Sequence, residues 1–202
     1  MEYQIKRISN KEIDILAKEK EFPVNSINSL GIIIPYSYLK ELVSLNWYDI
    51  LFAVENGFLL LQSVIECAVK KIENNEDYTC EVLELACITK DELSECRDLI
   101  YCDLKKLANQ VLDVYKKETK AKILYVLLSW VFDHRELYED PLNIVEFIYD
   151  DFGFPESISS FVRYRPVNES ALNLNNLGVE HLFENWKDYL NKEKIKYLKR
   201  EE

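Results

Sequence analysis

The stretch ILYVLLSWVF, residues 123–132, decides the fold that we expect for this chain. All of its residues except Ser129 are apolar, so a helix built from them is apolar on nearly all sides. The run is about half as long as the ~20 residues that cross a bilayer. We therefore expect a helix that other helices surround, in the middle of a bundle or solenoid.

Helical signals extend from this run along most of the chain. Ser9 with Glu12 and Thr89 with Glu92 form capping boxes, and Asp140 before Pro141 has the pattern of an N-cap and first helical residue. Between such signals, apolar residues recur at steps of three and four. We predict helices at about 10–20, 37–45, 47–55, 58–72, 80–88, 89–115, 121–137 and 140–150, a short helix after Pro155, and a C-terminal helix within 178–200.

Low counts of glycine (4) and proline (5) also favour helices over a sandwich or barrel. We predict an all-α protein, either an irregular multi-helix bundle or a short α-superhelix of stacked antiparallel helix pairs. The segment GIIIP, residues 31–35, is either a strand or a buried loop. We expect one domain over residues 1–202, with 1–36 as a candidate N-terminal subregion and the 178–200 helix after an Asn-rich linker at 167–177.

Net charge and cysteine usage restrict the partners and the compartment. A formal net charge of −11 argues against binding nucleic acid or an anionic membrane surface. The N-terminal residues show no apolar signal region, and five cysteines without CxxC spacing fit reduced, buried thiols. We expect a cytoplasmic protein that needs no metal or cofactor.

Charge is distributed in blocks. Residues 73–103 hold ten acids and two bases, and residues 133–156 hold eight acids and one base. Residues 105–122, between them, hold six bases and two acids. Either the basic stretch folds between the two acidic blocks, or the acidic faces meet a basic protein partner.

Enzyme motifs are weak. GxSxG, P-loop and HExxH patterns do not occur in the chain. Asp133 precedes His134, and Glu146 and Asp150 share a helix face, so a metal-dependent hydrolase would have to use these four residues. Since neighbouring residues point to different helix faces, we expect no enzyme.

The segment DPLNIVEFIYDDFGFPESISSFVRYRP, residues 140–166, has the most distinctive pattern. We expect its aromatic residues Phe152, Phe154, Phe161 and Tyr164 to turn inward as a hydrophobic plug. Arg163 and Arg165 flank Tyr164, and we expect one of them to pair with a carboxylate of the preceding helix.

This segment resembles the signature of an uncharacterised bacterial family, DPLxxVExIYxDFxxPExIxxFVRYxP. The chain departs from the family pattern at Gly153, Phe154 and Arg165, which argues against a polar role for that loop. Some members resemble immunity proteins, which neutralise polymorphic toxins by direct contact. The resemblance implies a cytoplasmic inhibitor of a basic toxin; the alternatives are a helical scaffold without a toxin partner and, less favoured, the hydrolase. The candidate partner-binding residues are Tyr138, Glu146, Tyr149, Asp150, Asp151, Arg163 and Arg165.

Overall fold

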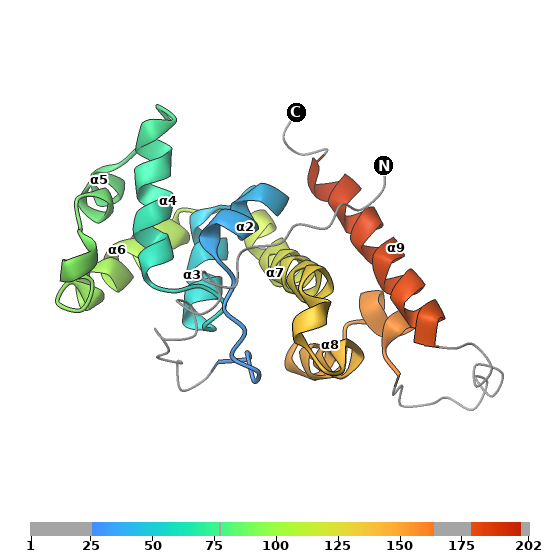
Figure 1. Ribbon diagram of the computed structural model, residues 1–202. Coiled ribbons are helices and arrows are strands. Elements are labelled where there is room, and N and C mark those ends of the chain that lie inside the picture. The colour runs from blue at the N-terminus through green and yellow to red at the C-terminus, as the bar shows by residue number, and fades with distance from the viewer. Residues whose placement is uncertain (1–25, 77, 164–178, 199–202) are drawn as a thin grey trace. The chain divides into compact units, whose positions relative to one another are not determined.

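A computed structural model describes residues 26–76, 78–163 and 179–198, and within these ranges the chain is all-α without a strand (Figure 1). The predicted fold class is confirmed. The α-helices are α2 (Tyr36–Leu42), α3 (Trp47–Glu55), α4 (Gln62–Glu73), α5 (Cys80–Ala86), α6 (Arg97–Asn109), α7 (Asp113–Asp133), α8 (Pro141–Asp151) and α9 (Val179–Leu198). The 3-10 helices are η1 (Lys90–Glu92), η2 (Arg135–Leu137) and η3 (Glu156–Phe161).

The apolar run ILYVLLSWVF, residues 123–132, forms the second half of α7. Every residue from 123 to 132 is at most 7% exposed, including Ser129, whose hydroxyl donates to the Tyr125 carbonyl at 2.8 Å. The prediction of a helix buried on all sides is therefore confirmed. Across the described ranges, no helix combines the length and the apolar character needed to span a membrane.

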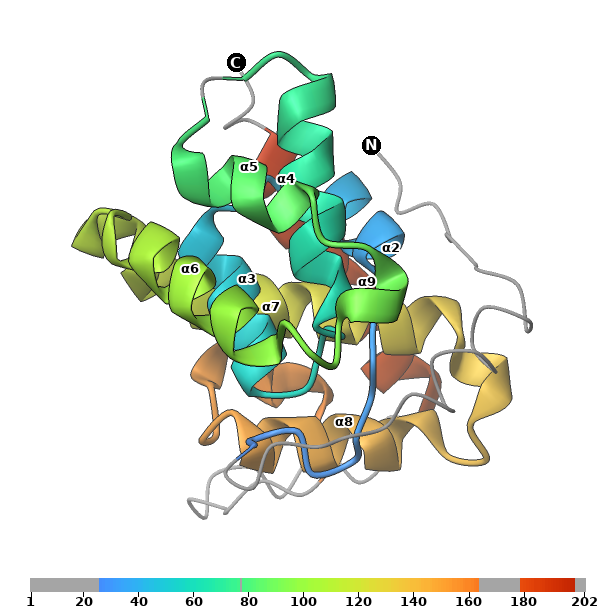
Figure 2. The same ribbon diagram turned by 90° about the vertical axis from the view of Figure 1, so that its left-hand side faces the viewer.

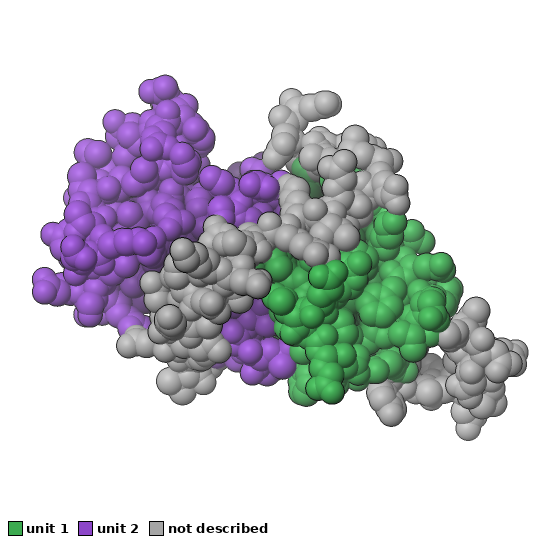
Figure 3. Space-filling model, in the orientation of Figure 1, with its two compact units in different colours: residues 1–7, 124–202 green, residues 8–123 purple. Residues whose placement is uncertain are grey.

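The chain divides into two compact units, residues 8–123 and residues 1–7 with 124–202, and the boundary falls inside α7 (Figure 3). The expectation of one domain, and the choice between a bundle and a superhelix, stay predictions.

In the unit of residues 8–123, α4 packs on α2 and on α5, and α6 packs on α3 and on α5 (Figures 1 and 2). The GIIIP segment, residues 31–35, was expected to be either a strand or a buried loop. Its residue Ile34 is 1% exposed, and the Ile34 N–H donates to the Phe58 carbonyl at 2.8 Å. The other residues of the segment are half-buried, so it is a partly buried loop and not a strand. The largest fully buried side chains of this unit are Phe58, Ile34, Leu39, Ile50, Leu85, Ile100, Leu104 and Ile123.

In the unit that contains residues 124–202, η3 packs on α9 and on α8. Trp186 of α9 is fully buried; its ring lies parallel to Phe161 at 5.9 Å and meets the edge of Phe132 at 5.1 Å. Phe152 is also buried, at 4% exposed. The predicted hydrophobic plug is confirmed for Phe152 and Phe161.

Several predicted boundaries are wrong. The helix predicted at 89–115 is interrupted at residues 110–112, and residues 116–120, which fall between the predicted helices 89–115 and 121–137, lie inside α7. The reason is local: Lys and Glu are good helix formers, and Asp113 in the first turn of α7 favours a helix start. The Thr89–Glu92 capping box exists, but it caps η1, and α6 starts only at Arg97.

Two further helices start at positions that differ from the prediction. α2 begins at Tyr36 after Pro35, and α4 begins at Gln62 rather than near Phe58. The helix expected at 10–20, its Ser9–Glu12 capping box, the linker at 167–177, Tyr164 and Arg165 lie outside the described residues.

The cysteines correct another expectation. All five are free thiols, but only Cys67 is buried, while Cys80, Cys87 and Cys102 are exposed. Cys80 and Cys102 lie on outward positions of α5 and α6. The expectation of buried thiols is therefore wrong for Cys80, Cys87 and Cys102.

Candidate partner-binding face

Helix α8 is fixed at its start by the predicted cap. The Asp140 carboxylate accepts a hydrogen bond from the Asn143 N–H at 3.2 Å, and Pro141 occupies the first helical position, where no backbone donor is needed. Five apolar residues at helical spacing are at most 7% exposed: Leu142, Val145, Ile148, Tyr149 and Phe152. α8 therefore has one buried stripe and one outer face.

The outer face of α8 carries exposed residues at helical spacing. Asn143, Phe147 and Asp150 are exposed and stand four and three residues apart. The side chain of Phe147 is 45% exposed, although a phenylalanine is more commonly found in a core. An exposed aromatic ring thus lies one helical turn from an exposed carboxylate.

A left-handed turn at Gly153 ends α8. Gly153 has φ +75°, and its N–H donates to the Asp150 carbonyl at 2.9 Å; the Phe154 N–H donates to the Tyr149 carbonyl at 2.9 Å. These two bonds define a Schellman motif, and the Phe154 ring meets the edge of the Tyr149 ring at 5.3 Å, as is usual for this motif. Yet Phe154 is 57% exposed, so its expected place in the hydrophobic plug is wrong. We call Phe147, Asp150 and Phe154 the α8 face.

Arg163 ties the chain that follows η3 back to α8. Its Nη1 lies 2.9 Å from Asp140 Oδ2, and its Nε lies 2.7 Å from Glu146 Oε1. The hydrogen bond to Glu146 raises the pKa of Arg163. Burial works to raise the pKa of Asp140, but hydrogen bonds from Arg163 and from the Asn143 N–H outweigh it and leave this pKa lowered. The expected pairing of one arginine with a carboxylate of the helix is confirmed.

The structure therefore divides the candidate partner-binding residues. Glu146 and Arg163 pair with each other, whereas Asp150 is exposed and Asp151 is half-buried. Tyr149, expected as an anchor for a partner, is only 7% exposed because it belongs to the inner stripe of α8. Burial also raises the pKa of Tyr138, which forms a hydrogen bond with Trp130. Neither tyrosine is an exposed anchor, and Arg165 lies outside the described residues.

Phe147 and Phe154 are the residues that sequence reasoning missed. A signal for Phe147 was present, because it lies off the stripe of inner positions 142, 145, 148, 149 and 152. A glycine directly after a helix predicts a left-handed turn, but nothing in the sequence says whether the next ring turns inward or outward.

Charge pairing accounts for much of the basic stretch. Lys106 pairs with Asp103 at 2.8 Å, and Lys105 lies 3.6 Å from Glu55. Lys122 is buried beside Asp49. Of these three partners only Asp103 belongs to one of the two acidic blocks, so the hypothesis that the basic stretch folds between those blocks stays a prediction.

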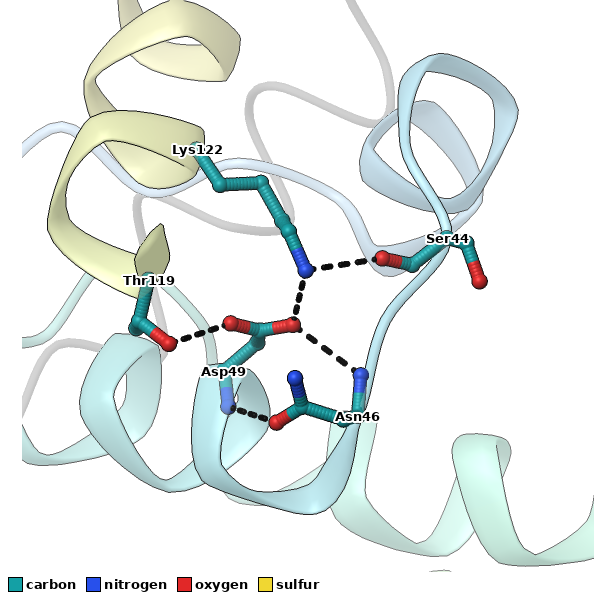
Figure 4. A network of polar contacts seen from close by, with 5 residues as sticks. All are labelled: Ser44, Asn46, Asp49, Thr119 and Lys122. Atoms are coloured by element: carbon teal, nitrogen blue, oxygen red, sulfur yellow. Dashed lines mark hydrogen bonds and ion pairs between the residues drawn. The ribbon is translucent and has the colours of Figure 1, made fainter. Parts of the chain in front are cut away.

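The Asp49 network is a second polar cluster, and it is buried (Figure 4). One oxygen of the Asp49 carboxylate accepts from Thr119 Oγ1 at 2.5 Å. The other accepts from the Asn46 N–H at 3.0 Å and from Lys122, whose Nζ also donates to the Ser44 carbonyl at 3.0 Å. Because both charged groups are paired and hydrogen-bonded, this network joins α7 to the start of α3 and serves stability.

The four residues named for a hydrolase do not assemble a metal site. Among the described side chains, no group of three or more His, Cys, Asp or Glu is placed to hold a metal ion. His134 is 4% exposed, its Nδ1 lies 2.8 Å from the Trp130 carbonyl, and its ring stacks on Trp130 at 3.8 Å. These contacts give His134 a packing role at the end of α7.

The fold and this site define an all-α protein with an acidic and aromatic helix face. The chain belongs to the family described as "uncharacterized protein conserved in bacteria (DUF2247)", which matches residues 36–194. The expected membership of an uncharacterised bacterial family is therefore confirmed, while the signature of segment 140–166 and the link to immunity proteins stay predictions.

One curated protein shares a short region with this chain. It is the ribonucleoside-diphosphate reductase subunit beta of Bacillus phage SPbeta, 40% identical over 75 residues. That alignment covers 36% of this chain and 21% of the phage protein. No solved structure gives a significant match.

Proposed function

We propose that this protein is a binding module that engages a basic protein partner through the α8 face. The observation that carries the proposal is the pair of exposed rings, Phe147 and Phe154, on either side of the exposed Asp150. Aromatic side chains dominate the energy of many interfaces, and an exposed cluster of them indicates a contact surface.

The charge around this face supports a basic partner. Residues 133–156 hold eight acids and one base. Asp133 is buried, and Arg163 offsets one further unit through Asp140 and Glu146, which leaves a net charge of −5 (2 − 7). A surface with this excess attracts a cationic protein and accelerates its association at low salt. The partner would place Lys or Arg side chains near Asp150 and apolar side chains on the two rings.

The specific form that we propose is an immunity-type inhibitor, which covers the cationic surface of a toxin. This form is supported by the expectation that some members of the family resemble proteins of that type and by the acidic net charge of −11. A helical scaffold that binds a partner without neutralising it is the alternative.

Site-resolved photo-crosslinking tests the binding surface. The photoreactive residue p-benzoylphenylalanine would replace Phe147 in one variant and Leu83 in another; both side chains are 45% exposed, and Leu83 lies on α5. We expect illumination in the native host to link one basic protein to position 147 but not to position 83, with less product at high salt. Equal yields from the two positions, or no product from position 147, would contradict the proposal.

Co-expression then separates an inhibitor from a scaffold. The captured partner would be expressed alone, with the wild-type protein, and with the variant Phe147→Ala/Phe154→Ala. If the protein is an inhibitor, the partner alone arrests growth, the wild type restores it, and the variant does not. A partner that is harmless alone would overturn the inhibitor form and leave the binding surface standing.

A further inference from the structure

A pocket of about 410 Å³ opens between α2, α4 and the segment that carries η1, all within residues 8–123. This volume lies in the range of roughly 300–1,000 Å³ that is typical of sites for small ligands. Three segments that are far apart in sequence form the pocket, so no local sequence motif predicts it. Its lining residues are Tyr36, Ser37, Lys40, Gln62, Ile65, Glu66, Val69, Lys70, Ile88 and Lys90.

The inner part of the pocket is apolar and neutral. Tyr36 and Ile65 are each 9% exposed, and Val69 and Ile88 are half-buried. Tyr36 forms a side-chain hydrogen bond with Cys67 behind it, and burial raises the pKa of both groups. Both therefore stay protonated at neutral pH, and this part of the pocket suits a hydrocarbon chain or an aromatic ring.

The rim of the pocket is cationic. Lys40, Lys70 and Lys90 stand on it and are exposed, against a single carboxylate, Glu66. Three positive charges and one negative charge leave a local excess of +2 (3 − 1) in a protein whose net charge is −11. The sign of the rim is thus opposite to that of the molecule.

Existing contacts occupy part of this rim. Lys70 pairs with Glu73 on the same helix, and Glu66 accepts a hydrogen bond from Gln62 at 2.7 Å. The ammonium of Lys40 lies 5.9 Å from the centre of the Tyr36 ring, at the border between rim and interior. Lys40 and Lys90 are therefore the two cations best placed to meet an anionic head group.

We propose that this pocket binds a small amphipathic anion, with its apolar body against Tyr36, Ile65 and Val69 and its anionic head between Lys40 and Lys90. A cationic ligand would meet the three lysines, and a neutral apolar ligand would gain nothing from them. The chemistry that the pocket recognises is an apolar group of modest size joined to a carboxylate, sulfonate or phosphate. This site lies on other elements than the α8 face and does not depend on the proposed function.

The probe for this site is 8-anilinonaphthalene-1-sulfonate, an aromatic anion that fluoresces when it leaves water. We expect saturable binding of one probe per folded chain, and displacement of the probe by decanoate. Decanol has the same chain but no charge. It is expected to compete about tenfold less well, because it lacks two weak ionic contacts with the lysines. Decyltrimethylammonium, which carries the opposite charge, is expected to compete least.

Charge-reversal variants locate the binding. Lys40→Glu/Lys90→Glu should weaken decanoate binding at least about tenfold, because two attractive charges become repulsive. Lys117→Glu, which reverses an exposed lysine that does not line the pocket, serves as the matched control and should bind as the wild type does. Circular dichroism checks that both variants are folded, and Val69→Trp, which fills the pocket, should abolish binding without a charge change.

Two results would overturn the inference. If decanol competes as well as decanoate, the lysines contribute nothing and no anion site exists. If Lys40→Glu/Lys90→Glu and Val69→Trp both bind the probe as the wild type does, the probe occupies another surface.

Discussion

Helices α3 and α8 end in the same pair of backbone hydrogen bonds and place a phenylalanine at the same position. Of these two phenylalanines only Phe154 has a positive φ, +59°, and the two rings lie in opposite environments. At the end of α3 the Gly57 N–H donates to the Val54 carbonyl at 3.0 Å, and the Phe58 N–H donates to the Ala53 carbonyl at 2.8 Å. Gly57 and Gly153 have φ of +70° and +75°. Phe58 is completely buried, whereas Phe154 is 57% exposed.

The comparison separates what the backbone motif requires from what the core requires. A Schellman motif satisfies the last carbonyl groups of a helix and commonly adds one apolar contact, which Phe154 makes with Tyr149. It does not require the ring to be buried in the core, as Phe58 is. We therefore infer that Phe58 serves stability and that Phe154 is available to a partner.

The largest expected effect is the difference in stability between removing the Phe58 ring and removing the Phe154 ring. Phe58→Ala should lower the free energy of unfolding by about 3–5 kcal/mol, because it leaves a cavity in the core. Phe154→Ala loses one aromatic contact and should cost about 1 kcal/mol or less. Urea unfolding of both variants measures the two values, and equal losses would show that the two motifs are energetically alike.

A buried charge should matter about as much as the buried ring. Asp49→Ala leaves the Lys122 ammonium, which is 8% exposed, without its carboxylate, and should cost about 3–5 kcal/mol. Glu55→Ala, on the same helix, removes the exposed pair with Lys105 and should cost about 1 kcal/mol at most. If the two variants unfold at the same urea concentration, the Asp49 network contributes no more than a surface ion pair.

Sequence reasoning succeeded where the signal is local. The cap formed by Asp140 and Pro141 and the capping box of Thr89 and Glu92 each depend on residues within a few positions of one another. It failed at residues 110–112, because an apolar stripe at helical spacing continued across a break that no Gly or Pro marks.

The functional features could not be predicted because they depend on long-range contacts. Lys122 meets Asp49 across 73 positions, and the pocket joins Tyr36, Ile65 and Ile88. Whether Phe154 turns outward depends on space around the end of α8, which only the folded chain defines. Charge blocks predicted an acidic surface, but not that Arg163 would cover Glu146 and leave Asp150 exposed.

The turn at Gly153 offers a smaller test of the same comparison. A Cβ added at Gly153 would meet nothing within 4 Å. Gly153→Ala should therefore lower the free energy of unfolding only by the strain of an alanine in the left-handed conformation, about 1–2 kcal/mol. Asn tolerates this conformation better, so Gly153→Asn should cost less. Thermal unfolding of the two variants checks the order, and an Ala variant as stable as the wild type would show that the turn adjusts freely.

The smallest effect should come from Arg163 and should depend on pH. The pKa of Asp140 is lowered in the folded protein, so its contribution is present above its unfolded pKa of about 3.9 and is lost as pH falls through the folded value. The stability gap between the wild type and Arg163→Gln should be full at neutral pH and should close in acid. Arg163→Lys, which keeps the charge but not the two-pronged contact, should fall between them. A gap that does not change down to pH 2 would exclude this ion pair as its cause.

The affinity of the captured partner for two matched double variants tests the central claim most directly. Phe147→Ala/Phe154→Ala removes the rings of the α8 face, and Leu83→Ala/Leu99→Ala removes two leucines of comparable exposure on α5 and α6. Calorimetric titration should show the first variant weakened by about thirtyfold or more, the equivalent of about 2 kcal/mol, and the second unchanged. If the first variant binds the partner as tightly as the wild type does, the α8 face is not the binding surface.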